Sequence, residues 1–295
     1  MNKKKNVILI DGHSYLYRSY YGLFKNRHQY YHLDDIIYQI LYIFKTMFIK
    51  YKPNKFIIIF DKDKKNFRNK IFEPYKKNRK KMPEKLKIQI PILIKILNNI
   101  GIPVISIPNV EADDVIGTIS KQEEKKNRHV FIGTSDKDLT QLVNKNIHII
   151  NNMNNSILTE NEVKKKYGVY PNFMIDFLSL VGDVSDNIPG VKGIGKTIAI
   201  KLINKIGPIK KIYKNLSKIH QMEFRGHQNI IKKLCDGKDM AFLSYQLIQL
   251  KFNVNIDKKY LPFNLKQLFQ PCQYYNVKYI NIIHDMKKII LNNQK

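Results

Sequence analysis

The stretch Phe56-Ile-Ile-Ile-Phe-Asp61 is a short, uninterrupted apolar run that ends in a carboxylate. Runs of this length and composition are typical of strands that are buried on both faces of a parallel sheet. Val7–Ile10, followed directly by Asp11, repeats the pattern. The same criterion predicts further strands at Pro103–Ile107, His129–Ile132 and Ile147–Ile150.

Amphipathic patterns lie between these strands and predict helices. They cover Asp34–Tyr51, Pro83–Asn99, Glu111–Lys126 and Ser135–Val143, with a kink at Pro91. Strands that alternate with helices predict an α/β fold whose mostly parallel sheet is joined by right-handed crossovers. After about residue 151 the sequence becomes mostly helical, with one helix that opens at Thr159 and another at Pro171–Val181. We therefore predict two domains, at residues 1–170 and 171–295.

The composition restricts the class of protein. The 295 residues carry 52 Lys and Arg against 24 Asp and Glu, so the formal net charge is +28, and 43% of the residues are hydrophobic. The apolar content excludes a disordered chain, and the charge indicates a polyanionic partner such as nucleic acid. The only two cysteines, Cys235 and Cys272, form no C-x-x-C pair. This excludes a zinc ribbon or a disulfide framework, and no disulfide partner is expected.

The sequence also bears on location. The N-terminus is basic and then apolar, but the apolar run Val7–Ile10 is too short for the core of a signal peptide. No stretch of about 18 uncharged apolar residues occurs that could cross a membrane. We therefore expect a cytoplasmic protein without a membrane partner.

Acidic residues gather at the ends of the predicted strands. They are Asp11, Asp61, Glu111, Asp113, Asp114, Asp136 and Asp138, and two more, Asp183 and Asp186, lie in the Gly- and Asp-rich turn region Gly182–Gly195. The carboxyl ends of parallel strands share one edge of the sheet, so we expect the acids that follow them to converge there. Oxygen-only ligands with this much negative charge favour Mg²⁺ or Mn²⁺ over zinc.

Each of these acids, taken singly, has another explanation. Asp138 lies three residues after Ser135 and could complete a helix start. Glu111 and Asp113 could favour a helix dipole, and Asp61 could form a turn. Three separate strands that each end in Asp favour the metal site over these alternatives.

A strongly basic segment follows Asp61. Residues Lys62–Lys87 hold twelve Lys and Arg and three acids, a net charge of +9, with aromatic residues at Phe67, Phe72 and Tyr75. Aromatic side chains among cations suit single-stranded nucleic acid, because bases stack on the rings while the cations meet phosphates. The alternative is a solvated loop in a protein that is rich in Lys throughout.

Gly190-Val-Lys-Gly-Ile-Gly-Lys-Thr197 matches the phosphate-binding loop pattern G-x-x-x-x-G-K-[ST] letter for letter. Such a loop must follow a buried strand, whereas Asp183–Pro189 reads as a turn. We therefore favour a helix–turn–helix-type hairpin whose backbone amides hold a duplex phosphate.

Five motifs occur in a recognisable order. They are Asp11-Gly-His-Ser-Tyr-Leu-Tyr-Arg18, Phe60-Asp61, Val110-Glu-Ala-Asp-Asp-Val-Ile-Gly117, Thr134-Ser-Asp-Lys-Asp-Leu139 and Gly182-Asp-Val-Ser-Asp-Asn-Ile-Pro-Gly-Val-Lys-Gly-Ile-Gly195. This order and spacing closely resemble the 5′→3′ exonuclease domain of bacterial DNA polymerase I, a member of the flap endonuclease family. The resemblance implies a PIN-like α/β domain with a helical arch, followed by a helical DNA-clamping domain.

The resemblance also implies roles for individual residues. Two Mg²⁺ or Mn²⁺ sites would use Asp11, Asp61, Glu111, Asp113 and Asp114 for the first and Asp136, Asp138, Asp183 and Asp186 for the second. Residues implied at the scissile phosphate are Arg18, Tyr75, Lys76 and Arg79. Those implied in DNA binding are Phe67, Arg68, Lys192, Gly193, Gly195 and Lys196. A monovalent cation such as K⁺ would bind in the hairpin.

The leading hypothesis is a structure-selective 5′ nuclease that acts on DNA flaps, nicks and RNA-primed ends in replication and repair, with a separate DNA polymerase as a partner in trans. One rival is a PIN-type ribonuclease, although short ribonucleases of that type lack both the hairpin and the arch. The other is a basic binding protein without catalysis, which has no need for nine carboxylates in the motif positions.

Overall fold

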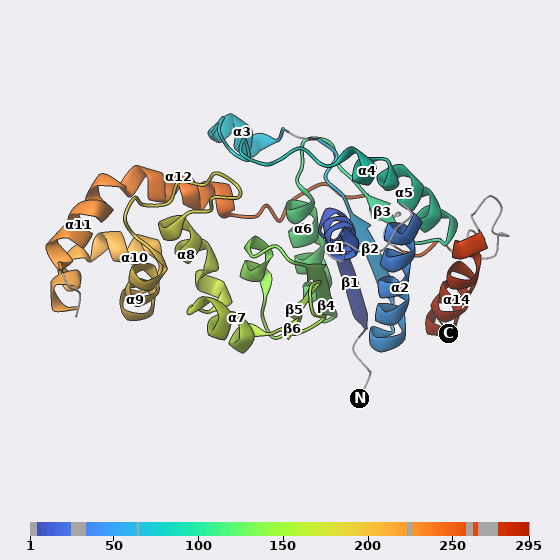
Figure 1. Ribbon diagram of the computed structural model, residues 1–295. Coiled ribbons are helices and arrows are strands. Elements are labelled where there is room, and N and C mark those ends of the chain that lie inside the picture. The colour runs from blue at the N-terminus through green and yellow to red at the C-terminus, as the bar shows by residue number, and fades with distance from the viewer. Residues whose placement is uncertain are drawn as a thin grey trace.

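The computed structural model describes residues 5–24, 34–63, 65–222, 226–257, 262–264 and 277–294. Its centre is a six-stranded sheet in the order β3-β2-β1-β4-β5-β6 (Figure 1). The strands are β1 (Asn6–Asp11), β2 (Lys55–Ile59), β3 (Val104–Ile105), β4 (His129–Thr134), β5 (Ile147–Asn151) and β6 (Ile157–Leu158). Strands β1 to β5 are parallel and β6 is antiparallel to β5, so the predicted mostly parallel sheet is confirmed.

The apolar runs are buried on both faces of the sheet, as their composition predicts. Successive side chains of a strand point to opposite faces. Val7 and Leu9 of β1 accordingly join one core cluster, and Ile8 and Ile10 join another. Helix α6 (Ala112–Lys125) covers the first face, and α1 (Gly12–Phe24), α2 (Asp34–Tyr51) and α5 (Gln89–Asn99) cover the second. Among the described residues, no helix is long and apolar enough to span a membrane.

Three predicted elements are shorter than expected. The strand expected at Pro103–Ile107 is only β3, because prolines at 103 and 108 flank it and cannot donate to a ladder. The helix expected at Pro83–Asn99 is divided into α4 (Glu84–Lys87) and α5, which places Pro91 in a first turn instead of at a kink. The helix expected at Ser135–Val143 is the 3₁₀ helix η1 (Asp138–Leu142).

The basic segment holds short helices. It contains α3 (Phe67–Ile71), a run of turns and then α4, so the implied arch has only five and four helical residues in these two elements. Asn66 caps α3 by accepting a hydrogen bond from the backbone amide of Arg68.

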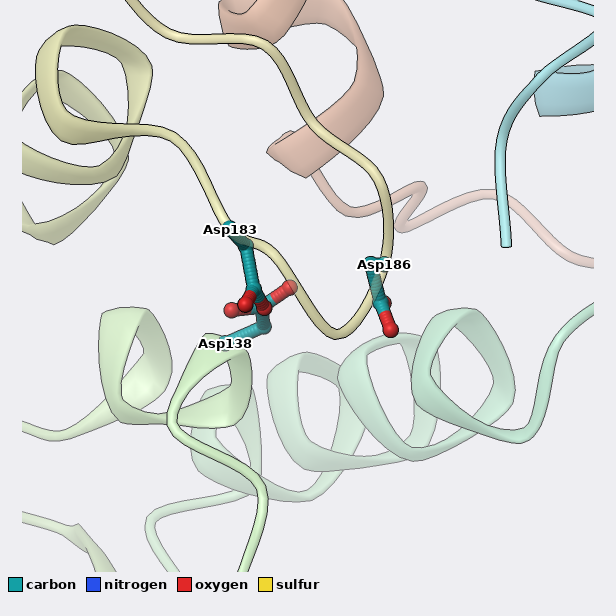
Figure 2. Close-up of side chains that lie close together, drawn as sticks. All are labelled: Asp138, Asp183 and Asp186. Atoms are coloured by element: carbon teal, nitrogen blue, oxygen red, sulfur yellow. The ribbon is translucent and has the colours of Figure 1, made fainter. Parts of the chain in front are cut away.

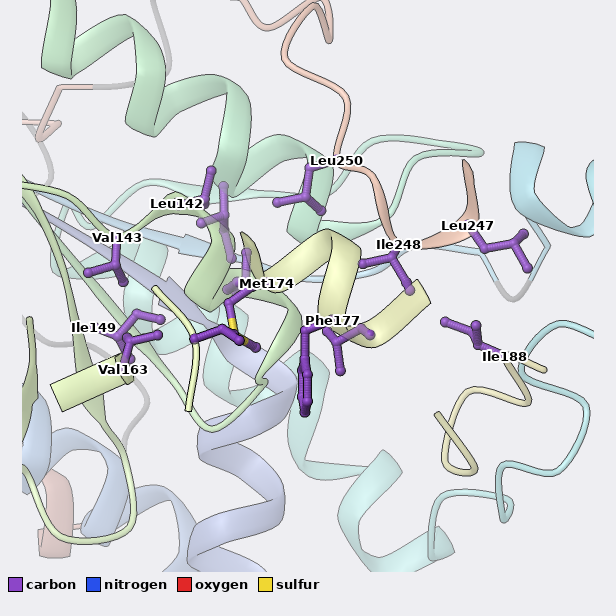
Figure 3. Packing of buried hydrophobic residues seen from close by; sticks show 14 of the residues in the cluster. Leu142, Val143, Ile149, Val163, Met174, Phe177, Ile188, Leu247, Ile248 and Leu250 are labelled. Carbon is purple, nitrogen blue, oxygen red and sulfur yellow. The ribbon is translucent and has the colours of Figure 1, made fainter. Parts of the chain in front are cut away.

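The second half is helical, as expected, and packs on the sheet without a break in the core. Its elements are α7 (Glu160–Tyr167), η2 (Pro171–Phe173), α8 (Met174–Val181), α9 (Lys196–Ile206), α10 (Ile209–Lys214), η3 (Leu216–Gln221), α11 (His227–Asp236) and α12 (Lys238–Ile248). Met174 and Phe177 of α8 join the same cluster as Leu142 and Ile149 of the sheet domain (Figure 3). In Figure 1 helices α8 to α12 form a lobe on one side of the sheet.

The last helix, α14 (Val277–Gln294), returns to the first half and packs against α2. The Lys45 ammonium lies 2.5 Å from a carboxylate oxygen of Asp285, and the Tyr279 hydroxyl donates to the backbone carbonyl of Asp34 at 3.1 Å. The helix therefore lies against the outer side of α2, away from the helical lobe (Figure 1).

Candidate metal centre

Four predicted acids meet at the carboxyl edge of the sheet. Asp11 ends β1, Asp61 lies two residues beyond β2, Asp136 lies two residues beyond β4, and Asp113 is in the first turn of α6. All four line one cleft with a volume of about 480 Å³. The expected convergence of carboxylates is thus realised, because the parallel register brings these chain segments to one edge.

Within the described part of the chain, the cations near this cleft do not offset burial and the mutual repulsion of Asp11, Asp113 and Asp136. Burial and the neighbouring Asp61 and Asp136 raise the pKa of Asp11 to about 6, although the Ser14 amide donates to it at 3.1 Å. Burial and the other acids also raise the pKa of Asp113 and of Asp136. A cation between them would relieve this repulsion.

Asp61 is the exception. Burial would raise the pKa of Asp61, but the neighbouring His13 and the hydrogen bond from the Ala112 amide lower it to about 2. His13 Nδ1 lies 3.5 Å from Asp61 Oδ2, and the Ala112 amide donates to Oδ1 at 2.7 Å. His13 and the Ala112 amide therefore favour the ionised form of Asp61, although the sequence indicated no role for His13.

A second acidic group lies beside the first. Asp138, Asp183 and Asp186 each offer a carboxylate oxygen, and these oxygens lie within 4.8 Å of one another. Asp183 and Asp186 lie on the loop after α8, and Asp138 begins η1 (Figure 2). Burial, followed by the charges of Asp136 and Asp186, raises the pKa of Asp138 well above its ordinary value. Its Oδ1 atom is buried without a hydrogen-bond partner in the described part of the chain. An orphaned oxygen among carboxylates fits a hard divalent cation.

Three cations flank this second group. Lys137 Nζ lies 2.8 Å from Asp183 Oδ1, and Arg79 donates to Asp186 Oδ1 at 2.7 Å. Lys76 Nζ lies 3.7 Å from Asp186 Oδ2. Lys137 was missed in the sequence, although its place between Asp136 and Asp138 was a usable signal. Arg79 and Lys76, which the resemblance implied at the scissile phosphate, lie beside these acids.

Two residues with predicted ligand-binding roles, Arg68 and Asp114, form a buried ion pair with each other. Arg68 was expected to bind DNA, but it is 1% exposed. Asp114 was expected to bind metal, but it is 0% exposed and both of its carboxylate oxygens accept hydrogen bonds from Arg68. The two side chains neutralise each other inside the protein, so neither is free for a ligand.

Glu111 belongs to the same buried group. Its Oε2 accepts from Arg68 at 2.7 Å, and its Oε1 accepts from Lys76 at 2.6 Å and from Asn66 at 2.9 Å. It does not line the cleft that holds the four acids. Its carboxylate therefore holds Lys76 in place, which differs from the implied role in metal binding.

The aromatic residues of the basic segment are also engaged. Tyr75 is 4% exposed, and its hydroxyl donates to Glu111 at 3.3 Å. This hydroxyl is thus engaged by Glu111, and the implied contact of Tyr75 with the scissile phosphate stays a prediction. Phe67 is half-buried, with the Lys251 ammonium 3.4 Å from its ring centroid. Arg18 lines the cleft and donates to Asn155 at 3.4 Å.

The turn that resembles a phosphate-binding loop follows helix α8, not a strand. Gly190 and Gly193 have φ of +62° and +80°, which permit the tight turn. Val191 and Ile194 are buried and anchor it, whereas its predicted DNA-binding residues are exposed. These exposed residues are Lys192, Gly193, Gly195 and Lys196. Gly195 caps α9, which Lys196 begins.

Two family models match the chain, the N-terminal resolvase-like domain of 5′-3′ exonucleases over residues 6–168 and their C-terminal SAM fold over residues 169–270. The chain belongs to the 5′-3′ exonuclease family. It is 45% identical to a 5′-3′ exonuclease of Buchnera aphidicola subsp. Acyrthosiphon pisum over 281 residues, which cover 92% of this chain and 98% of the relative. It is 37% identical to DNA polymerase I of Pseudomonas aeruginosa over 85% of this chain and 28% of that protein.

Solved structures show the same fold. T5 5′-exonuclease with bound zinc aligns with a TM-score of 0.67 at 21% identity over 99% of this chain and 100% of that one. The catalytic core of Rad2 in complex with a DNA substrate aligns with a TM-score of 0.58 at 16% identity over 99% of this chain and 93% of that one. The resemblance and the fold class predicted from the sequence are confirmed. This nuclease of the 5′-3′ exonuclease and flap endonuclease family matches the leading hypothesis rather than either rival.

Proposed function

We propose that this nuclease hydrolyses DNA at 5′ flaps, nicks and RNA-primed ends during replication and repair in the cytoplasm. The observation that carries the proposal is the pair of adjacent acidic groups, flanked by Arg79 and Lys76, at the carboxyl edge of the sheet. Carboxylates that hold cations and basic side chains that hold phosphate are the two requirements of metal-assisted phosphodiester hydrolysis.

We propose two Mg²⁺ or Mn²⁺ ions at these groups. The donor sets fit, because they consist of carboxylates and include the unpartnered Oδ1 of Asp138. One set is Asp11, Asp61, Asp113 and Asp136, and the other is Asp138, Asp183 and Asp186. When bound, such ions lower the pKa of a water molecule and stabilise the leaving oxygen.

The basic side chains have a separate task. Arg79 has a side chain that is 47% exposed, and it lines the same cleft as Arg18. Both guanidiniums can form paired hydrogen bonds to a phosphate, which would orient the scissile bond above the carboxylates. The Thr134 hydroxyl donates to Asp11 at 2.9 Å and fixes the direction of that carboxylate.

The exposed hairpin supports duplex binding. Lys192 lies on the turn and Lys196 begins the helix that follows it, and the N-terminus of a helix suits a phosphate. We propose a monovalent cation such as K⁺ in the same turn. Gly190 and Gly193 support it, because their positive φ lets the backbone fold into a compact loop. DNA affinity should then be higher in K⁺ than in tetramethylammonium at equal ionic strength.

A DNA polymerase is the partner we propose in trans. The support is the matching segment of DNA polymerase I of P. aeruginosa, in which the two activities share one chain. A pull-down with purified polymerase and flap DNA would test this association.

The decisive experiment uses a 5′-labelled flap duplex with Mg²⁺ or EDTA, beside Asp136→Asn. We expect Mg²⁺-dependent cleavage near the junction, lost in the variant while DNA binding persists. A single-stranded RNA of the same sequence is the comparison for the ribonuclease alternative. Binding without cleavage in either Mg²⁺ or Mn²⁺ would refute the proposed activity.

A further inference from the structure

We propose that Arg68 is a positioning residue that connects the duplex-binding half of the protein to Lys76 in the active site. Through this connection, a duplex held by the hairpin would set the position of Lys76 beside the scissile phosphate. The inference rests on the proposed function, since it assumes that the hairpin holds a duplex and that Lys76 serves the cleavage site.

The guanidinium of Arg68 has all five of its N–H donors bonded. Nη1 donates to Glu111 Oε2 at 2.7 Å and to Asp114 Oδ2 at 2.7 Å. Nη2 donates to Asp114 Oδ1 at 2.9 Å. Glu111 is the N-cap of helix α6 in the sheet domain, and Asp114 lies in the first turn of that helix. This end of Arg68 is therefore fixed to the nuclease domain.

The remaining donors reach the helical half. Nε donates to the backbone carbonyl of Leu247 at 2.7 Å, and Nη2 donates to that of Gln249 at 3.1 Å. Lys251 completes the link, because its backbone amide donates to Asp114 Oδ1 at 2.8 Å. In Figure 1 the segment that carries α3 accordingly reaches toward α12. One planar side chain thus joins two parts of the chain that are 179 residues apart.

Helix α12 carries the connection onward to the hairpin. Ser244 is 0% exposed and lies one helical turn before Leu247. Its hydroxyl oxygen accepts the backbone N–H of Gly190 at 3.0 Å. A displacement of the hairpin would therefore reach the carbonyl groups that hold Arg68 through a rigid helical segment.

On the other side, Glu111 connects Arg68 to Lys76. Glu111 accepts from Arg68 on one oxygen and from Lys76 on the other. Lys76 has φ of +56° and donates its backbone N–H to the carbonyl of Asp186 at 2.9 Å. A non-glycine residue rarely adopts this conformation, so the surroundings must hold it there. Arg68 is the buried cation that keeps Glu111 in place for this purpose.

Lysine cannot replace this arrangement. It offers three donors on a flexible chain, whereas arginine presents a rigid planar fork. Arg68→Lys preserves the buried charge but gives up the contacts that reach both halves at once. The second variant is Asp114→Asn, which weakens the hydrogen bonds that Asp114 accepts from Arg68. Lys55→Gln is the matched control. The Lys55 ammonium lies 3.1 Å from the buried Glu123 carboxylate, and neither residue lines the cleft.

The first measurement is steady-state cleavage of 5′ flap DNA in Mg²⁺ over a range of substrate concentrations, which gives kcat and KM. A displacement of about 1 Å in a positioned group can cost about 100-fold in rate, so we expect Arg68→Lys to lower kcat by about 10- to 100-fold. KM and the Kd for duplex should change by less than about threefold, since the hairpin surface is intact. Lys55→Gln should lose thermal stability without this loss of kcat.

A double-mutant cycle tests whether the effect passes through Lys76. In the Lys76→Ala background, Arg68→Lys should cause no further loss of rate. If the losses multiply, Arg68 acts independently of Lys76 and the proposal is wrong. Equal losses of kcat in Arg68→Lys and Lys55→Gln would likewise assign Arg68 to stability alone.

The second measurement needs no cleavage. Hydrogen exchange in EDTA compares the amides of residues 75–79 with and without a flapless duplex. We expect the duplex to slow exchange there in the wild type and not in Arg68→Lys or Asp114→Asn. Equal protection in all three proteins would overturn the proposal, as would the failure of both variants to fold. Flap cleavage by the wild type tests the proposed function separately, so the two failures are distinguishable.

Discussion

Asp113 and Asp114 are neighbours in the sequence with opposite surroundings. Successive residues of a helix point about 100° apart, so Asp113 faces the cleft while Asp114 faces Arg68 inside the protein. Lys137 likewise differs from its sequence neighbours Asp136 and Asp138, because its ammonium forms an ion pair with Asp183. At the residue scale, the partner that each charge meets decides its task.

Lys137 should oppose metal binding in the DNA-free protein. Its ammonium neutralises an oxygen of the second acidic group, and partly exposed ion pairs of this kind contribute about 0.2–1 kcal/mol. We expect Lys137→Gln to raise the affinity for Mn²⁺ by up to about fivefold. Titration followed by electron paramagnetic resonance would measure it. Lys121→Gln, which removes an ion pair to Glu124 outside the cleft, is the control. Unchanged or weaker Mn²⁺ binding would contradict the prediction.

Glu123 should make stability depend on pH. Its carboxylate is 0% exposed and is bonded to Lys55, Lys126 and Arg128. Burial opposes ionisation, but the hydrogen bond from Lys126 and the charge of Lys55 outweigh it and lower the pKa of Glu123. A lowered folded-state pKa stabilises the protein above the ordinary pKa of Glu, near 4.3, and this contribution is lost as the pH falls through the folded-state value.

Glu123→Gln should therefore lower the free energy of unfolding by about 1–3 kcal/mol at pH 7.5. The difference from the wild type should narrow toward pH 4, because the unfolded chain begins to take up a proton there that the folded protein binds only at lower pH. Urea denaturation at both pH values provides the measurement. A gap that is the same at both pH values would show that the charge of Glu123 is not responsible.

At the scale of elements, the hairpin between α8 and α9 depends on backbone geometry more than on side chains. Gly182 and Gly190 pack closely, since a Cβ atom on Gly190 would lie 2.4 Å from the Gly182 nitrogen. The isolated bridge between Asp183 and Ile188 closes the loop that carries two acids of the second group. The proposed duplex-binding hairpin and the second acidic group thus share one loop.

Gly190→Ala should disturb both functions of this loop. Its φ of +62° and the backbone contact together cost about 1–3 kcal/mol of stability, and duplex affinity should fall with the loop. Gly195→Ala is the stability control, because φ is −90° and nothing lies within 4 Å of the added atom. Its free energy of unfolding should change by less than about 0.5 kcal/mol. Equal destabilisation in the two variants would refute the steric argument.

At the scale of the whole molecule, positive and negative charges are unevenly distributed. The net charge is +28, yet acids gather at one edge of the sheet and the basic segment crosses beside them. Such an arrangement attracts a phosphate backbone over a long range and leaves the metal site to act at short range. The continuous core between the sheet and the helical half holds both regions in one frame (Figure 3).

DNA affinity should consequently fall steeply with salt. Each phosphate contact contributes about −0.9 to the slope of log affinity against log salt. Lys80 and Lys81 are exposed in the basic segment, so we expect Lys80→Ala/Lys81→Ala to reduce the slope by about 2 for flap DNA. Fluorescence anisotropy in EDTA at several salt concentrations would measure it. A slope that is unchanged by the double substitution would place the phosphate contacts elsewhere.

The sequence by itself determined the sheet and the positions of the acids. Apolar runs such as Val7–Ile10 can only be buried on two faces, and an acid at the end of a parallel strand must lie at the shared edge. The sequence did not determine where the helix that contains Pro91 begins, or that the helix at Asp138 is a 3₁₀ helix. Alternative local backbone hydrogen bonds compete at both places.

Only the tertiary structure decided which charges face the cleft. Arg68 meets Leu247, and Lys137 meets Asp183, through contacts between segments that are distant in the chain. Patterns of neighbouring residues report the period of a helix or strand and contain no information about such distant partners. A buried charge is stable only when paired, so those partners turned Arg68 and Asp114 from predicted ligand-binding residues into internal supports of the active site.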